Sequence, residues 1–136
     1  MIGVATYVYG LVKSAKPLAL KKPPRGLEGT VKPRVVDAGG GWSLLVTDAP
    51  LALYDAKAID KQLRDLDWVS ARAGEHDEVL EHAMALGTLV PLKLFTLFND
   101  EERAIAHVTK SRRSLDRVAA KIEGCEEWSL RIMLAE

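Results

Sequence analysis

The sequence contains little that is typical of a secreted, membrane-anchored or disulfide-bonded protein. Its single cysteine, Cys125, excludes an intrachain disulfide and suits a reducing, cytoplasmic setting. The N-terminal stretch lacks the basic region and small-residue cleavage site of a secretory signal. The most apolar run, residues 83–98, contains Gly87, Pro91 and Lys93, and it is shorter than the roughly 20 residues that a membrane-spanning helix needs. We therefore expect one cytoplasmic domain, residues 1–136, without a membrane anchor.

Patterns for catalysis and for metal or cofactor binding are missing as well. The sequence has no HExxH, CxxC or GxSxG pattern. His76 and His82 are spaced so that they fall on different sides of a helix, unlike a pair of metal ligands. The triplet Gly39-Gly40-Gly41 precedes a strand rather than a helix, so it indicates a tight hairpin rather than a phosphate-binding loop. We predict that the protein is not an enzyme and has no cofactor or metal.

The chain has no excess of either charge, because Lys plus Arg and Asp plus Glu both number 19. This balance argues against a general binder of polyanions. Positive charge still gathers in two places, the proline-rich loop 13–34 and one face of a predicted helix, where the residues are Lys110, Arg113, Arg117 and Lys121. This ridge is either a site for phosphates or an acidic protein, or the solvated back of an amphipathic helix. A small nucleic-acid or anion-binding module using residues 110–121 is thus the alternative function, although the neutral net charge disfavours it.

Hydrophobic periodicity predicts strands and helices in mixed order. The predicted strands are residues 4–12, a short strand at Val35 and Val36, residues 42–48, residues 89–98 and residues 127–134. One helix is expected from an N-cap at Asp55 to Gly87 with an interruption at Gly74, and another from an N-cap at Asn99, paired with Glu102, to Gly124. This order predicts an α+β, ferredoxin-like sandwich whose mainly antiparallel sheet carries helices on one face.

The predicted strand 89–98 is apolar on both sides, which a sheet with one open face does not explain. Leu89, Lys93, Phe95 and Leu97 share the side away from the helices, and Tyr7 and Tyr9, or else Val4 and Val8, would extend it from the first strand. Such a sheet indicates that a partner, another copy or the loop 13–34 covers its second side. The predicted partner-binding residues are Tyr7, Tyr9, Lys93, Phe95, Leu97 and Arg131.

Four short motifs follow one another along the chain. They are Tyr7-Val8-Tyr9-Gly10; His76 with Val79 and Leu80; Pro91 and Leu92 with Thr96 and Phe98; and Gly124 with Glu127 and Trp128. In order and spacing, this set resembles the gas vesicle synthesis proteins of the GvpF/GvpL family. The third family motif reads Val-Leu-Pro-(Leu/Met)-Arg-Phe-Gly-Thr-Val-Phe. The present chain has Lys93-Leu94-Phe95 where the family has Arg-Phe-Gly, so the positive charge is kept and the glycine is lost.

The resemblance implies a function that composition does not. It implies the family's α+β, ferredoxin-like N-terminal domain alone, without the C-terminal domain that family members usually carry. It further implies a non-enzymatic, cytoplasmic accessory protein that associates with gas vesicles. Such a factor would bind the small hydrophobic gas vesicle shell protein or other gas vesicle accessory proteins and help to assemble the shell. Self-association into a homo-oligomer stays open.

Overall fold

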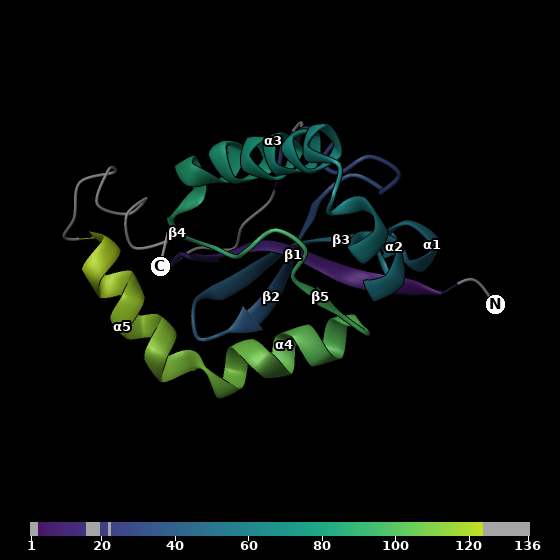
Figure 1. The fold of residues 1–136 in the computed structure, drawn as a ribbon. Coiled ribbons are helices and arrows are strands. Elements are labelled where there is room, and N and C mark those ends of the chain that lie inside the picture. The colour runs from purple at the N-terminus through teal and green to yellow at the C-terminus, as the bar shows by residue number, and fades with distance from the viewer. Residues whose placement is uncertain (1–2, 16–19, 22, 124–136) are drawn as a thin grey trace.

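The protein folds around one antiparallel sheet with helices on both of its faces (Figure 1). The computed structural model describes residues 3–15, 20–21 and 23–123. The strands are β1 (Val4–Lys13), β2 (Arg34–Gly39), β3 (Trp42–Pro50), β4 (Thr88–Pro91) and β5 (Leu97–Phe98). The helices are α1 (Leu51–Tyr54), α2 (Ala56–Gln62), α3 (Leu66–Ala83), the short 3₁₀ turn η1 (Met84–Leu86), α4 (Glu101–Lys110) and α5 (Arg112–Glu123). The predicted α+β, ferredoxin-like class and antiparallel sheet are confirmed.

Strand β1 is the centre of the sheet. The strand order is β2-β3-β1-β4, and β5 pairs with β1 beyond the end of β4. Every pairing is antiparallel. The predicted hairpin joins β2 and β3 through Gly39, Gly40 and Gly41, all three of which have positive φ angles that side chains with a Cβ rarely adopt. The hairpin partners were therefore readable from the sequence, whereas the central place of β1 was not.

A β-bulge interrupts the pairing of β1 with β3. Val8 lies opposite Val46 and Gly10 lies opposite Leu45, so Tyr9 is an extra residue in β1. Tyr7 and Tyr9 both enter the core beneath α3, as does Val12. Val8 and Leu11 enter the other core.

The two faces of the sheet are covered by different helices, so the prediction of helices on one face is wrong. Helix α3 lies above the sheet in Figure 1 and α4 and α5 lie below it. On the α3 side the core contains Tyr7, Tyr9, Leu27, Tyr54 and Leu80, among others. On the α4–α5 side the core contains Val8, Trp42, Leu44, Val46 and Val108, among others. A sheet that is apolar on both faces must bury both, and the chain supplies each cover itself.

The helix boundaries differ from those predicted. Helix α3 runs through Gly74, because that residue lies in open space on the exposed side and leaves the helix backbone intact. The interruption comes earlier, before Asp65, whose carboxylate accepts hydrogen bonds from the first amides of α3. Asp55 caps α2 as expected. Asp100, not Asn99, caps the next helix, which breaks at Ser111 into α4 and α5.

Residues 89–98 do not form one continuous strand, which corrects a central prediction. Pro91 pairs with Gly10 and Leu97 pairs with Tyr7, so residues 92–96 stand opposite only two residues of β1. The excess forms a turn at Lys93–Phe95, in which the Thr96 hydroxyl donates to the Lys93 carbonyl at 2.7 Å. Phe95 has a φ of 68°, in the left-handed region.

The predicted last strand, with Arg131 and the helix end at Gly124, lies outside the described residues. Among the helices of the described residues, none has the length and apolar character needed to cross a membrane.

Candidate functional site: a pocket beside α1, α2 and α3

A buried network of hydrogen bonds joins β1, α3 and the turn after β4. The Tyr7 hydroxyl lies 2.7 Å from Nδ1 of His76, and the Phe95 amide donates to the same hydroxyl at 3.1 Å. Nε2 of His76 lies 3.0 Å from the carbonyl oxygen of Leu92. Tyr7 and Tyr9 are both fully buried. Their predicted place on an open, partner-binding face is therefore wrong, because α3 and the segment around Leu27 cover them.

The network fixes the protonation state of His76. A carbonyl oxygen can only accept, so Nε2 carries the proton and Nδ1 accepts the proton of the Tyr7 hydroxyl. Burial lowers the pKa of His76, against a smaller opposing effect of the bond to the Leu92 carbonyl. Burial also raises the pKa of Tyr7. Both side chains are thus neutral, and they hold the 92–96 turn against α3.

A buried arginine fixes a second segment, residues 26–30, to the same helix. Arg72 donates from Nε to Glu75 at 2.6 Å and from Nη1 to Glu28 at 2.9 Å. Its side chain is only 8% exposed. Burial alone would lower the pKa of Arg72, but the hydrogen bond and charge of Glu75 outweigh it and the pKa is raised. The guanidinium therefore stays charged and joins two carboxylates.

Backbone groups of the segment 26–30 are held by two tyrosines. The Tyr9 hydroxyl accepts from the Leu27 amide at 3.1 Å, and the Tyr54 hydroxyl donates to the Glu28 carbonyl. The Glu28 amide donates to Glu75 at 3.1 Å. Burial raises the pKa of Tyr54 to about 12, so its hydroxyl keeps its proton. Hydrogen bonds from β1, α1 and α3 thus hold the segment in place.

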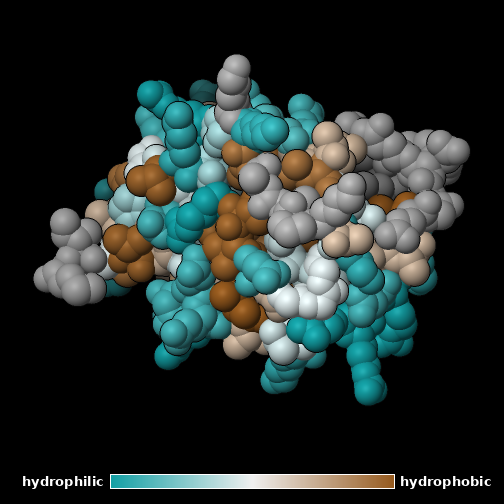
Figure 2. Space-filling model, turned by 180° about the vertical axis from the view of Figure 1, so that it is seen from behind, coloured by the Kyte–Doolittle hydropathy of each residue, from teal (hydrophilic) through white to brown (hydrophobic). Residues whose placement is uncertain are grey.

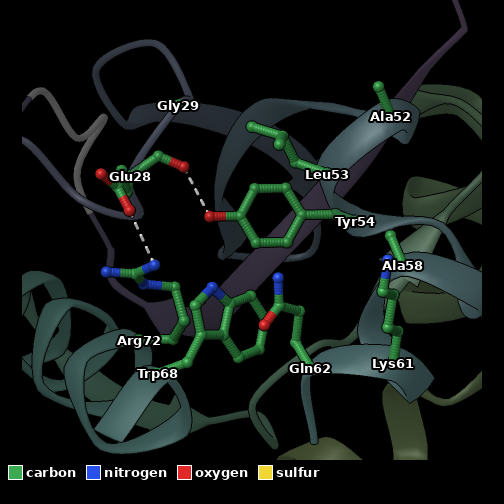
Figure 3. A pocket seen from close by; sticks show the side chains of 10 residues that line it. All are labelled: Glu28, Gly29, Ala52, Leu53, Tyr54, Ala58, Lys61, Gln62, Trp68 and Arg72. Atoms are coloured by element: carbon green, nitrogen blue, oxygen red, sulfur yellow. Dashed lines mark hydrogen bonds and ion pairs between the residues drawn. The ribbon is translucent and has the colours of Figure 1, made fainter. Parts of the chain in front are cut away.

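This pinned segment forms one wall of an open pocket of about 560 Å³ (Figure 3). The pocket is lined by Glu28, Gly29, Ala52, Leu53, Tyr54, Ala58, Lys61, Gln62, Trp68 and Arg72. In Figure 3 the rings of Tyr54 and Trp68 stand beside each other, with Arg72 and Glu28 to one side and Lys61 at the opposite side. The ring of Phe95, which is not part of the lining, stacks on Trp68 at 5.5 Å between centroids. The pocket therefore combines a rigid aromatic floor with a charged rim.

Three exposed leucines belong to the part of the chain that supplies most of the pocket lining. Leu53 lies in the lining and is 48% exposed, and Leu63 and Leu66, which follow α2 and begin α3, are 47% and 77% exposed. Exposed apolar side chains that gather on one surface are typical of a site that binds a partner. This pocket was not predicted, because its residues come from a loop and three helices. Leu63 and Leu66 gave no signal of their exposure, because they continue the helical spacing of Ile59 and Val69.

The model of one protein family, described as "Gas vesicle synthesis protein GvpL/GvpF", matches residues 5–136. The chain belongs to this family. One curated relative is Gas vesicle protein L of Streptomyces sp. (strain CB03234), which is 25% identical to this chain over 127 residues. The match covers 93% of this chain and 46% of the relative, so the chain spans about half of the relative's length. No solved structure matches the chain.

Three of the four family motifs supply parts of the buried network, and the fourth, with Gly124, Glu127 and Trp128, lies outside the described residues. The opening Tyr-Val-Tyr-Gly motif supplies Tyr7 and Tyr9, and the histidine-led helix supplies His76. The third motif supplies the turn that His76 and Tyr7 hold. Phe95 stands where the resemblance places a glycine, and its left-handed φ explains why glycine suits that position.

The other predicted site residues are dispersed. Lys93 is exposed at the tip of the turn, Phe95 and Leu97 are half-buried against the α3 core, and Arg131 lies outside the described residues. The basic ridge is exposed along its length, at Lys110, Arg113, Arg117 and Lys121. Among the described residues, no group of histidine, cysteine or acidic side chains is arranged to hold a metal ion.

Proposed function

We propose that this chain is a non-enzymatic accessory protein of gas vesicle formation. It binds an apolar segment of a gas vesicle protein, in the first place the shell protein, at the pocket beside α1, α2 and α3. The observation that carries the role is the family match over residues 5–136. The relative named Gas vesicle protein L supports it over 93% of this chain.

The pocket is the part of the surface best suited to an apolar partner. Its lining contains Tyr54 and Trp68, and Leu53 adds exposed apolar surface to it. Each Leu, Val, Ile or Phe side chain of a partner that becomes buried there contributes about 1.5–3 kcal/mol from the hydrophobic effect. The volume of about 560 Å³ has room for more than one such side chain.

The walls of the pocket are fixed before any partner arrives. Arg72, Tyr54 and Glu75 hold the segment 26–30, and the stack of Phe95 on Trp68 fixes the floor. A preformed pocket loses little conformational entropy on binding, and this favours affinity. The titratable groups around it, Glu28, Arg72 and Glu75, bond mainly to one another, an arrangement that supports a binding rather than a catalytic role.

The test is co-purification of the shell protein with this chain after co-expression. L53D/L66D places one carboxylate in the lining of the pocket and one at the start of α3, two residues before Trp68. It should reduce the recovered shell protein by at least about tenfold, because burying charge beside an apolar partner is unfavourable. M84D is the matched control, since Met84 is 41% exposed at the other end of α3. Circular dichroism checks that the variants are folded.

Two results would contradict the proposal. Equal recovery with L53D/L66D and with M84D would exclude the pocket as the binding surface. Recovery of neither the shell protein nor any other gas vesicle protein with the wild-type chain would exclude the accessory role itself.

The alternative, a nucleic-acid or anion-binding module, is favoured only by the exposure of the basic ridge. A salt titration of partner binding separates the two. Binding through the ridge should weaken steeply as salt rises, whereas apolar binding in the pocket should be nearly insensitive to salt.

A further inference from the structure

The exposed surface of α3 carries only negative charge. Its exposed carboxylates are Asp67, Asp77, Glu78 and Glu81. Between them lie small exposed residues, Ser70, Ala71 and Gly74. The basic residues of this helix do not offset the charge, because Arg72 is buried among its own partners and His82 bonds through Nε2 to the Lys21 carbonyl. We refer to these four carboxylates as the acidic α3 face.

The basic ridge, Lys110, Arg113, Arg117 and Lys121, is its counterpart on the other side of the molecule. Asp116, the acid of α5 whose surroundings are described, bonds to Lys13 at 2.8 Å and to Nε1 of Trp42 at 2.9 Å. The bond to Lys13 is the main reason why the pKa of Asp116 is lowered. Its charge is thus already matched by Lys13.

Neither surface is neutralised by ion pairs among the described residues. In the part that the structure describes, ion pairs involve Lys13, Arg34, Arg72 and Arg103, and none involves the ridge or the acidic α3 face. Arg25 and Lys21 are exposed on the segment beside α3, but they also form no ion pair with these carboxylates. A chain with zero formal net charge therefore carries one acidic and one basic helix surface.

The positions of the acidic α3 face and the basic ridge limit how the two can pair with each other. Helix α3 and helix α5 lie on opposite faces of the sheet (Figure 1). Seen from behind, the top and the lower right of the molecule are mostly hydrophilic, with a hydrophobic band between them (Figure 2). One chain cannot bring the two surfaces together. A two-fold dimer has one interface, and two surfaces on opposite faces of the sheet cannot both lie in it. Pairing of every acidic α3 face with a basic ridge therefore requires a head-to-tail arrangement of copies.

We propose that the acidic α3 face of one copy binds the basic ridge of a second copy, so that the protein associates head to tail. The charge complementarity within this one chain identifies the second copy as the occupant. The small residues between the carboxylates allow close approach of the facing helix. Exposed ion pairs are individually weak, so the association is reversible, grows with concentration and weakens with salt. If the proposed function holds, each row presents one pocket per copy, which raises the avidity for a repeating partner such as a shell.

Sedimentation velocity on the purified, nuclease-treated chain tests this. At an ionic strength of about 0.01 M the Debye length is roughly 30 Å, and at about 1 M it is roughly 3 Å. The weight-average mass should rise with protein concentration past that of a dimer at low salt and return to that of the monomer at high salt. A mass that stays that of the monomer at low salt would overturn the proposal. So would a mass that exceeds the monomer only before nuclease treatment, because the association would then depend on bound nucleic acid.

Charge variants make the test specific. R113Q/R117Q/K121Q removes three positive charges from the ridge and should abolish the association. K32Q/K57Q/R64Q removes the same charge from three exposed positions elsewhere and should associate at least tenfold more strongly than the ridge variant. Equal association of the two variants would contradict the assignment.

A charge-swapped chain completes the design. D77K/E78K/E81K alone, and R113E/R117E/K121E alone, should each stay monomeric, because both of their surfaces then carry the same sign. The chain with all six substitutions regains zero net charge and opposite surfaces, so it should associate again. Failure of this chain to associate while it remains folded would overturn the proposal. L53D/L66D should associate like the wild type, which separates this test from that of the pocket.

Discussion

The two faces of the sheet are stabilised by different kinds of contact. Beneath α4 and α5 the buried side chains are aliphatic apart from Trp42, and they pack in one continuous cluster. Beneath α3 the buried side chains include three tyrosines and His76, and hydrogen bonds link them to loop backbone. Aliphatic packing supplies stability with little directional preference. The polar face instead fixes where two loops lie, and these loops form the wall of the pocket and support its floor.

Leu44→Ala should have the largest effect and tests the aliphatic face. Leu44 is 1% exposed, and removal of its side chain leaves a cavity that costs about 2–5 kcal/mol in the free energy of unfolding. Urea denaturation followed by circular dichroism measures this. A loss below about 1 kcal/mol would mean that this face is loosely packed.

Tyr7→Phe tests the polar face and should have an effect of similar size. It leaves the Phe95 amide and Nδ1 of His76 without a partner, at about 1–3 kcal/mol for each buried group left unsatisfied. Hydrogen exchange of the Phe95 amide should accelerate, because the turn is no longer held. The matched control is Tyr9→Phe, whose hydroxyl accepts from the Leu27 amide in the other pinned loop, so Phe95 exchange should not change.

Phe95 gives a third test, because its left-handed backbone conformation lowers the stability of the fold whereas the stack of its ring on Trp68 raises it. Phe95→Ala and Phe95→Gly both lose the stack on Trp68, but only glycine adopts a φ of 68° without strain. The glycine variant should therefore be more stable than the alanine variant by about 1 kcal/mol. The opposite order, which is usual in helices and strands, would contradict the left-handed conformation.

The pH dependence of stability tests the neutral state of His76. Burial lowers the pKa of His76 in the folded protein from 6.5. At pH values between the folded pKa and 6.5, the unfolded chain therefore binds more protons than the folded protein. The contribution of neutral His76 to the free energy of unfolding is fully present above about pH 6.5. It is lost as the pH falls through the pKa of His76 in the folded protein. His76→Gln does not titrate and should lose less stability than the wild type on acidification. Identical pH profiles of the two proteins would contradict this prediction.

Lys93→Ala should have the smallest effect on stability. Lys93 is exposed and belongs to neither core, so the free energy of unfolding should change by no more than about 0.5 kcal/mol. A larger loss would show that Lys93 takes part in holding the turn. Lys93 is two residues from Phe95, whose ring stacks on Trp68 of the pocket. The co-purification assay with this variant therefore also tests whether Lys93 contacts a partner.

The sequence predicted the elements whose signals are local. The strand Val4–Lys13, the hairpin at Gly39–Gly41 and the cap at Asp55 follow from alternation, turn chemistry and capping. The break in 89–98 was missed because its cause lies in partner residues, the hydroxyl of Tyr7 and the ring of His76, which are distant in sequence. An apolar run of this kind has the same pattern whether it is one strand or two.

The candidate site was predicted only in part. The motif residues that the structure describes form the buried network, but Tyr7 and Tyr9 act in it through buried hydroxyls instead of an exposed surface. The pocket itself depends on how the segment around Glu28 folds over α3. That segment follows a proline-rich stretch without periodicity, so its course depends on long-range contacts that the sequence pattern does not contain.

The bulge at Tyr9 changes which positions of β1 face each core. Upstream of it, odd-numbered positions such as Tyr7 enter the α3 core, whereas downstream the even-numbered Val12 does so. Deletion of Tyr9 would remove the bulge and leave Leu11 and Val12 on their present faces, whereas one residue inserted between Gly10 and Leu11 would turn Leu11 toward α3 and Val12 toward α5. Both cores would then be mispacked at once, so the register of β1 should tolerate the loss of Tyr9 far better than an insertion after Gly10.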